Sequence, residues 1–399
     1  MKSTTNADGK SAANRNSKAR PNIHGKPVFT VKTRILNPKS DFRLKGLCGG
    51  PTFSAGSACC FSCTYCYVKP MMNRGKSAVA KVLKNAGRDF CGVVIRREQP
   101  LERLRAQLRD RHGELRYKQD DRIVYASPVV DVAATVELAD ETVELCGEVL
   151  ENTGWTIRLL SKSTLLGRIA GKIPAKWSRR IIYGVSTGTF DDEVAAAIEP
   201  DAPPPSKRLE TLAELQRQGL RTFAMLCPIL PQDPILFVKT ASDRIDFRKC
   251  QHVWAEVLNR RGNSMERTAR ALEQAGLESW AERLHRVYGD GSTPQWEAYA
   301  RSTFAALSAV VPSGKLRFMQ YVTPRSVEWW RGHEKLGAMV LGAAANRNGE
   351  PTEGETRRKA KRSEAAKKAQ VTIRANRAKR GSTDRLPRPK TSKQPVTQR

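Results

Sequence analysis

The chain has 399 residues, a formal net charge of +30 and 39% hydrophobic residues, and this low apolar content predicts that part of its length is unfolded tail. No segment approaches the run of about 20 apolar residues that spans a bilayer, which argues against a membrane protein. The polar N-terminus lacks the apolar centre of a signal peptide, and nine cysteines, an odd number, argue against a disulfide scaffold, so we expect a cytoplasmic protein.

The positive charge gathers at the two ends of the chain. Residues 1–45 carry a net charge of +9 and residues 357–399 carry +14, which leaves +7 for the residues between them. Basic arms attract polyanions through the phosphate backbone, without reading its sequence. We therefore expect the arms to contact nucleic acid, and the alternative is a pair of solubilising tails with no specific partner.

The composition divides the chain into four parts. Residues 1–45 are predicted to form a basic, largely disordered arm, and residues 344–399 a second disordered basic tail, because both are poor in apolar residues. Residues 46–232 form the predicted core. Residues 233–343 form a mostly helical C-terminal extension that completes the core.

Short apolar runs alternate with amphipathic runs of helical period along the core. Ser206, after three prolines, is predicted to cap the helix that Gly219 ends. In chain order the pattern predicts a strand over 122–130, a helix over 141–154, a strand over 155–161, a short helix over 163–173, a strand over 179–187, a helix over 206–219 and a strand over 220–231. Beyond these, residues 240–311 read as mostly helical and 315–322 as a late strand.

Strands that alternate with helices imply an α/β fold with a parallel sheet of βα units, either a barrel or an open, doubly wound form. In such folds the chemistry gathers at the C-terminal ends of the strands. We therefore expect the turns that follow Ser127, Ser161, Ser186 and Cys227 to face one site.

Four cysteines lie within eight positions in the stretch CCFSCTYC, residues 59–66. Cys59, Cys63 and Cys66 supply three thiols from one loop, whereas structural zinc sites usually take four ligands from two separate pairs. The other cysteines stand singly, and none of the five histidines has zinc spacing. Three thiolates on one loop suit a [4Fe–4S] cluster with one iron left open, and Cys60 is then a spectator.

The pattern C-x3-C-x2-C, with Tyr65 directly before the third cysteine, resembles the signature of the radical S-adenosylmethionine (SAM) enzymes. The resemblance implies a partial (β/α)6 TIM-type barrel in which the open iron of a [4Fe–4S] cluster binds SAM. In that family one electron from the cluster cleaves SAM to a 5′-deoxyadenosyl radical, which abstracts hydrogen from a substrate.

The likeness covers about residues 46–232 and is greatest to the branch that contains spore photoproduct lyase and DNA repair photolyase-like proteins. The segments LLSKS (159–163) and STGTFDDEVAAAIEPDAPPPSKRLE (186–210) carry it. Ala126 stands beside Ser127 where the spore lyase has its hydrogen-donating cysteine, which puts photoproduct repair itself in doubt.

The resemblance implies a role for each matching residue. Cys59, Cys63 and Cys66 would ligate the cluster, and Tyr65 would pack near the adenine of SAM. The polar contacts to SAM would come from Ser127, Lys162, Ser186 and Arg208. The plainer alternatives are a surface role for Lys162 and helix capping by Ser127, Ser186 and Arg208.

Cys227 ends a predicted strand and so is expected to face the same site. It is a candidate hydrogen donor, and the alternative is a thiol that packs in the core.

The sequence thus predicts a radical SAM enzyme that acts on nucleic acid and takes electrons from a reducing partner such as flavodoxin or ferredoxin. A first alternative is radical SAM modification of RNA or of a protein side chain. A second is a non-catalytic nucleic-acid-binding protein with a structural metal, which would need a fourth protein ligand.

Overall fold

The computed structural model describes residues 20–21, 25–69, 77–117, 119–126, 128–259, 263–289 and 293–343, together with residue 364. The predicted disorder of residues 1–19 and of the C-terminal tail beyond residue 343 falls outside these residues, residue 364 excepted. Residues 25–45 contain two strands and a short 3-10 helix, so the prediction that residues 1–45 are largely disordered is wrong for this part.

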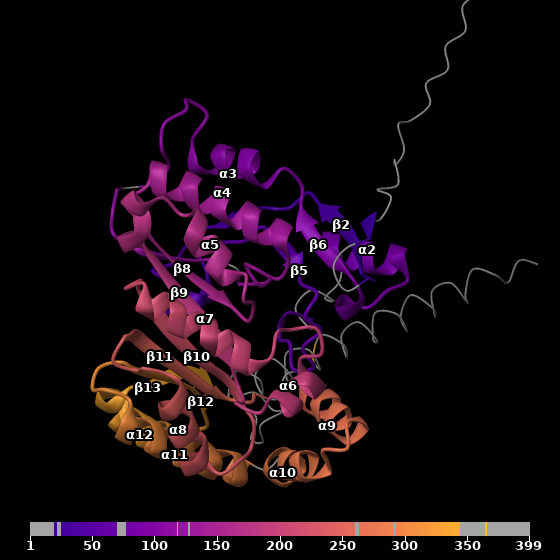
Figure 1. Ribbon diagram of the computed structural model, residues 1–399, viewed down its shortest axis with the longest axis vertical. Coiled ribbons are helices and arrows are strands. Elements are labelled where there is room, and N and C mark those ends of the chain that lie inside the picture. Colours follow the sequence, from indigo (N-terminus) through magenta and orange to yellow (C-terminus); the bar gives the residue numbers. More distant parts are fainter. Residues whose placement is uncertain are drawn as a thin grey trace, which may run out of the picture.

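The main sheet has nine strands in the described part of the chain, in the order β13-β12-β11-β10-β9-β8-β7-β4-β3 (Figure 1). All neighbouring pairs are parallel except β3 with β4, which are antiparallel. The strands are β3 (Leu36–Asn37), β4 (Thr52–Phe53), β7 (Ile123–Ala126), β8 (Thr156–Ser161), β9 (Ile181–Thr187), β10 (Thr222–Ile229), β11 (Cys250–Val257), β12 (Leu316–Val322) and β13 (Ala338–Ala343). The predicted α/β class is therefore confirmed.

Helices follow the strands and cover the outer face of the sheet. The helix α4 shows why: its residues Leu138, Leu145 and Val149 recur at helical spacing and are fully buried against the strands. The others in this layer are α5 (Leu166–Lys172), α6 (Asp192–Ile198), α7 (Pro205–Arg217), α8 (Pro234–Arg244), α11 (Thr293–Val310) and α12 (Val327–Gly332), with α4 spanning Val136–Asn152. Among the described helices, none combines the length and the apolar character that a bilayer crossing requires.

The inner face of the sheet is filled by its own side chains and by residues 42–48. Ile182, Phe223, Trp254 and Met319 pack there with Leu47. The strands therefore curve around an apolar interior, as in a barrel. Among the described residues the end strands β3 and β13 do not pair with each other, so the barrel is partial, as predicted.

A buried arginine fixes that inner segment. The Arg158 guanidinium donates to the main-chain oxygens of Gly46 (3.0 Å) and Leu47 (2.7 Å) and lies 4.5 Å from the ring centroid of Trp254. Burial lowers the pKa of Arg158 to about 10. The cation is held by carbonyl dipoles and aromatic faces.

A second sheet of four strands, in the order β1-β2-β6-β5 within the described residues, lies beside the first (Figure 1). Its strands are β1 (Arg20–Pro21), β2 (Pro27–Val31), β5 (Gly56–Ala58) and β6 (Val94–Arg97). The helix α2 (Ala78–Ala86) packs on this sheet, whereas α3 (Pro100–Leu108) lies beside α4. The strand β5 leads directly into Cys59, so this small sheet sets where the cysteine loop begins.

The structure adds one strand that was not predicted and corrects one predicted cap. Residues 240–311 are mostly helical, but the strand β11 lies between α8 and the helices α9 (Ser264–Gln274) and α10 (Glu278–Tyr288). The polar residues His252 and Glu256 break the apolar run and hid this strand. Ser206 is not the N-cap of α7, since the helix already begins at Pro205 and the Ser206 hydroxyl donates to Asp192.

We expect Arg158→Ala to lower the free energy of unfolding by about 3 kcal/mol, because it leaves two buried carbonyls without a donor and removes packing from two rings. Urea unfolding followed by tryptophan fluorescence measures this. Arg168→Ala is the matched control, since Arg168 pairs with Asp140 at the surface and its loss should cost less than about 1 kcal/mol. Equal losses in the two variants would contradict the structural role of Arg158.

Candidate functional site

Three neighbouring strands end in polar or thiol groups that meet. Lys162, directly after β8, donates from Nζ to Ser186 Oγ of β9 at 3.1 Å. The Ser186 hydroxyl donates in turn to the main-chain oxygen of Cys227 in β10, at 3.3 Å. The expected convergence at the C-terminal edge is therefore present for these residues. Ser127 lies outside the described residues.

Gly188 allows β9 and β10 to approach so closely. A Cβ atom on Gly188 would lie 1.8 Å from the main-chain oxygen of Pro228. Such a contact is sterically impossible, so only glycine fits there. The turn that carries Ser186 can therefore sit directly against the strand that carries Cys227.

The three predicted thiols of the cysteine loop lie within electrostatic reach of one another. Burial raises the pKa of Cys59 to about 12, and the neighbouring thiol of Cys66 acts in the same direction. Burial also raises the pKa of Cys63 well above its usual value, with Glu199 acting in the same direction and Lys162 against it. The loop thus lies within electrostatic reach of the residues at the strand ends.

Contacts from distant parts of the chain hold the loop in place. The Thr64 amide donates to the main-chain oxygen of Ile198 in α6 (2.9 Å), and its hydroxyl lies 2.8 Å from the Thr268 hydroxyl of α9. On the other side, Lys26 Nζ donates to Ser62 Oγ and to Asp201, the latter at 2.6 Å. Ser62 adopts φ 56°, a left-handed conformation that turns the loop back.

Cys60 engages the core through its thiol. Its side chain is fully buried, and Sγ donates to the main-chain oxygen of Ala134 at 3.4 Å. Cys60 therefore belongs to the core, as its predicted spectator role requires.

Tyr65 and Lys162 face each other across the site. Lys162 Nζ lies 5.6 Å from the Tyr65 ring centroid and 3.8 Å from Glu199 Oε1. The Tyr65 hydroxyl is buried and has no hydrogen-bond partner among the described residues. A buried donor left without a partner costs about 1–3 kcal/mol, and a ligand in the site would supply one.

Asp131 positions the strand end and was missed by the sequence analysis. Its carboxylate accepts hydrogen bonds from Ser161 Oγ (2.6 Å), from the Lys162 amide (2.7 Å) and from the Ala133 amide (2.9 Å). Burial raises the pKa of Asp131, and these donors oppose the rise. The only signal in the sequence was an acid soon after the predicted strand 122–130.

Arg208 lies behind the site. It forms a buried ion pair with Glu199 and donates to the main-chain oxygens of Pro203 and of Ser186, the last at 3.2 Å. Burial raises the pKa of Glu199, and the Arg208 cation opposes this. Arg208 therefore supports Ser186 and Glu199, whose other oxygen faces Lys162.

Cys227 contacts a second charged group. Its Sγ lies 3.6 Å from Glu256 Oε2, which also receives Lys45 Nζ at 3.1 Å. Burial and the Glu256 carboxylate raise the pKa of Cys227 far above its usual value. The group is therefore a protonated thiol at neutral pH, half-buried and packed on the inner apolar cluster.

The donor set suits a cluster held by three thiols. Three cysteines come from one loop, and a lysine and an unpartnered hydroxyl stand beside them. In the described part of the chain, no three His, Cys, Asp or Glu side chains lie close enough together to hold one metal ion as they stand.

Comparisons with known proteins give distant similarities, and no family model matches the chain. The uncharacterized protein ORF301 of Acidianus two-tailed virus is 30% identical over 102 residues, which is 23% of this chain and 32% of that protein. The chain thus matches about a third of the length of this relative.

Solved structures align with the chain only at low TM-scores. A mutant of spore photoproduct lyase with bound AdoMet and dinucleoside spore photoproduct aligns at a TM-score of 0.40 and 10% identity, over 56% of this chain and 61% of that one. Native anSMEcpe with bound AdoMet aligns at 0.32 and 13% identity, over 56% and 58%. These likenesses are distant, so any functional assignment depends on the chain's own residues.

We expect Arg208→Met to lower the free energy of unfolding by about 3–5 kcal/mol, because it leaves Glu199 buried without its cation. Replacing both partners in Arg208→Met/Glu199→Leu should recover most of that loss, and a double-mutant cycle in urea measures the coupling. The neighbouring exposed pair of Lys207 and Glu210 is the control, and Lys207→Met should cost less than about 1 kcal/mol. A double variant as unstable as Arg208→Met would contradict the role of the pair.

Proposed function

We propose that this chain is a radical SAM enzyme that binds a [4Fe–4S] cluster through Cys59, Cys63 and Cys66 and acts on a nucleic acid. One observation carries the proposal: the loop with three cysteines lies within electrostatic reach of Lys162 at the C-terminal edge of a parallel sheet, and Lys162 Nζ lies 5.6 Å from the ring centroid of Tyr65, whose hydroxyl has no partner among the described residues. A structural zinc site has four protein ligands, whereas this loop supplies three thiols and has the Lys162 ammonium and the Tyr65 hydroxyl beside it.

When bound, the cluster would supply the single electron that splits SAM into methionine and a 5′-deoxyadenosyl radical. The electron would come from a reducing partner of the flavodoxin or ferredoxin class. Nine free cysteines fit a reducing compartment such as the cytoplasm.

Lys162 is the residue we assign to the SAM carboxylate. Its ammonium group already lies at the site, since Ser186, Glu199 and the ring centroid of Tyr65 are all within 5.6 Å of it. A charge-assisted hydrogen bond to a carboxylate would replace water around this cation. Tyr65 would pack against the adenine, and Ser186 would hold a second polar group of SAM.

Asp131 and Arg208 act as positioning residues. Asp131 holds the main chain of Lys162, and Arg208 holds Glu199 and the main chain of Ser186. Arg208 is buried and Asp131 is half-buried, and both are engaged by hydrogen bonds, so neither needs to touch the ligand to affect its binding.

Cys227 is the candidate for returning a hydrogen atom to the substrate. A hydrogen-atom donor must carry its S–H bond, and burial keeps this thiol protonated. The nucleic-acid substrate is supported by the concentration of positive charge in the first 45 and last 43 residues of the chain.

The test is anaerobic reconstitution with iron and sulfide, followed by dithionite and SAM and chromatographic detection of 5′-deoxyadenosine. We expect the wild-type chain to form it. Cys59→Ala, Cys63→Ala and Cys66→Ala should each reduce its formation by at least about 100-fold and lower the bound iron, since each removes one of three ligands.

Cys60→Ala is the matched control, because this neighbouring thiol lies in the core and should leave both iron content and product unchanged. Wild-type protein that binds metal but releases no 5′-deoxyadenosine would support the non-catalytic alternative. Oligodeoxynucleotides, RNA and a protein extract offered as substrates separate the remaining alternatives.

We also expect Lys162→Met to weaken SAM binding to the reconstituted protein by about 10- to 100-fold, the effect of losing one charged hydrogen bond. Equilibrium dialysis with labelled SAM measures it. The control is Lys172→Met, on α5, whose ammonium pairs with the surface carboxylate of Asp140. Unchanged affinity in Lys162→Met, at normal iron content, would remove Lys162 from the cofactor site.

A further inference from the structure

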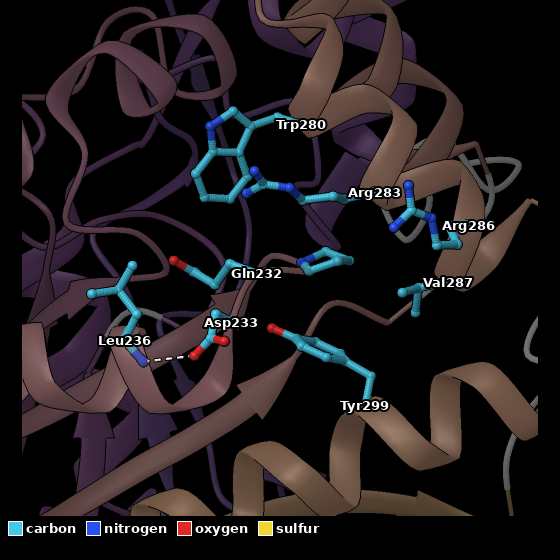
Figure 2. Close-up of a pocket in the computed structure, with 9 residues that line it drawn as sticks. Gln232, Asp233, Leu236, Trp280, Arg283, Arg286, Val287 and Tyr299 are labelled. Carbon is cyan, nitrogen blue, oxygen red and sulfur yellow. Dashed lines mark hydrogen bonds between the residues drawn. The ribbon is translucent and has the colours of Figure 1, made fainter.

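A pocket of about 440 Å³ opens between the end of β10 and the helices α8, α10 and α11 (Figure 2). This volume falls in the range of small-molecule sites. Its lining residues are Pro231, Gln232, Asp233, Leu236, Trp280, Arg283, Arg286, Val287 and Tyr299. None of them belongs to the candidate SAM site.

One wall of the pocket combines an aromatic ring with two cations. The guanidinium of Arg283 lies 5.1 Å from the Trp280 ring centroid, and Arg286 follows one helical turn later. Both arginines are exposed, and neither forms an ion pair with any described residue. Such a surface suits a ligand that has both a flat ring and a negative charge.

The opposite wall carries polar groups (Figure 2). Tyr299 is oriented by its hydroxyl, which donates to the main-chain oxygen of Leu230. Gln232 and the carboxylate of Asp233 stand beside it, and Asp233 also accepts the Leu236 amide at 2.8 Å as the cap of α8. An amide and a carboxylate can pair with the donors and acceptors on the edge of a nucleobase.

The pocket lies at the same edge of the sheet as the candidate site. Pro231 and Gln232 come four and five positions after Cys227 along the chain, directly beyond the end of β10. The helices α9 and α10 lie side by side, and α9 carries Thr268, which contacts Thr64 of the cysteine loop. A polymer could therefore occupy the pocket with one unit and present another to the site.

We propose that this pocket binds one nucleotide of a single-stranded nucleic acid, with the base against Trp280 and Arg283 and the phosphate at Arg283 and Arg286. This inference rests on the proposed function for its substrate class and adds the place where the polymer is held. An acidic peptide could pair with the two arginines, but it would not need to stack on the Trp280 ring or to form hydrogen bonds with the polar wall.

The test is fluorescence anisotropy of labelled 12-mer single strands of DNA and of RNA on the full chain, without SAM or reductant. We expect Trp280→Ala to weaken binding by about tenfold, the usual effect of losing one stacked base. Trp280→Phe should retain most of the affinity. Arg283→Gln/Arg286→Gln should lower the slope of log affinity against log salt by about 1 to 2, one for each phosphate that the variant no longer neutralises.

A second hollow, of about 450 Å³ between α5 and α7, supplies the matched control. There Lys207 and Arg217 are paired with Glu210 and Glu214, and no aromatic ring is present among the lining residues. Lys207→Gln/Arg217→Gln removes the same charge and should leave affinity and salt slope close to wild type. Equal losses of oligonucleotide affinity in both double variants would show that only net charge matters, and would overturn the proposed binding of a nucleotide in the pocket.

Wild-type affinity and salt slope in the pocket variants would also overturn the proposal, as would tight binding of an acidic peptide that competes with the oligonucleotide. Failure of the proposed function gives a different result, because a chain that forms no 5′-deoxyadenosine can still lose oligonucleotide binding on Trp280→Ala. Circular dichroism confirms that each variant is folded.

Discussion

The candidate site depends on two carboxylates that are surrounded by hydrogen-bond donors, the half-buried Asp131 and the fully buried Glu199. Asp131 takes hydrogen bonds from the end of β8, and Glu199 takes the guanidinium of Arg208. Lys162 lies between them, with its main chain held by the first and its ammonium near the second. The position of this one cation thus depends on two carboxylates, and the buried one, Glu199, is costly to leave unpaired.

The inner face of the sheet closes one side of that arrangement. Arg158 and residues 42–48 fill the interior of the partial barrel. The polar residues at the C-terminal ends of the strands lie next to this packed interior. Cys227, the candidate hydrogen donor, therefore packs against the apolar side chains of the barrel interior. An apolar interior excludes water and strengthens the electrostatic interactions next to it.

The sequence predicted the parts of this structure that repeat. The alternation of strands and helices from residue 122 to residue 231 indicated a parallel sheet, and the parallel sheet in turn placed Lys162, Ser186 and Cys227 together. The spacing of the cysteines distinguished Cys60 from the other three, and its burial agrees.

What the sequence did not predict depends on contacts between distant segments. The short strands β2, β5 and β6 carry too few residues for a period to be visible, and β11 is interrupted by polar residues that have partners only in the fold. Asp131 and Lys26 gain their roles from the loops that they bind. The sequence predicted that Arg208 contacts SAM and did not predict its buried ion pair with Glu199, because that partner is recognised only in the folded chain.

The contact between Thr64 and Thr268 has a consequence for the order of assembly. It joins residues 204 positions apart, whereas Lys26 reaches the same loop across only 36 positions. Contacts of such long sequence separation form late, because a large loop of chain must close first. During synthesis the cysteine loop therefore leaves the ribosome long before α9 exists, and its three thiols become fully held only when the C-terminal half has folded. Before that point the loop would be held by Lys26, Ala134 and Ile198, and its contact with α9 would still be missing.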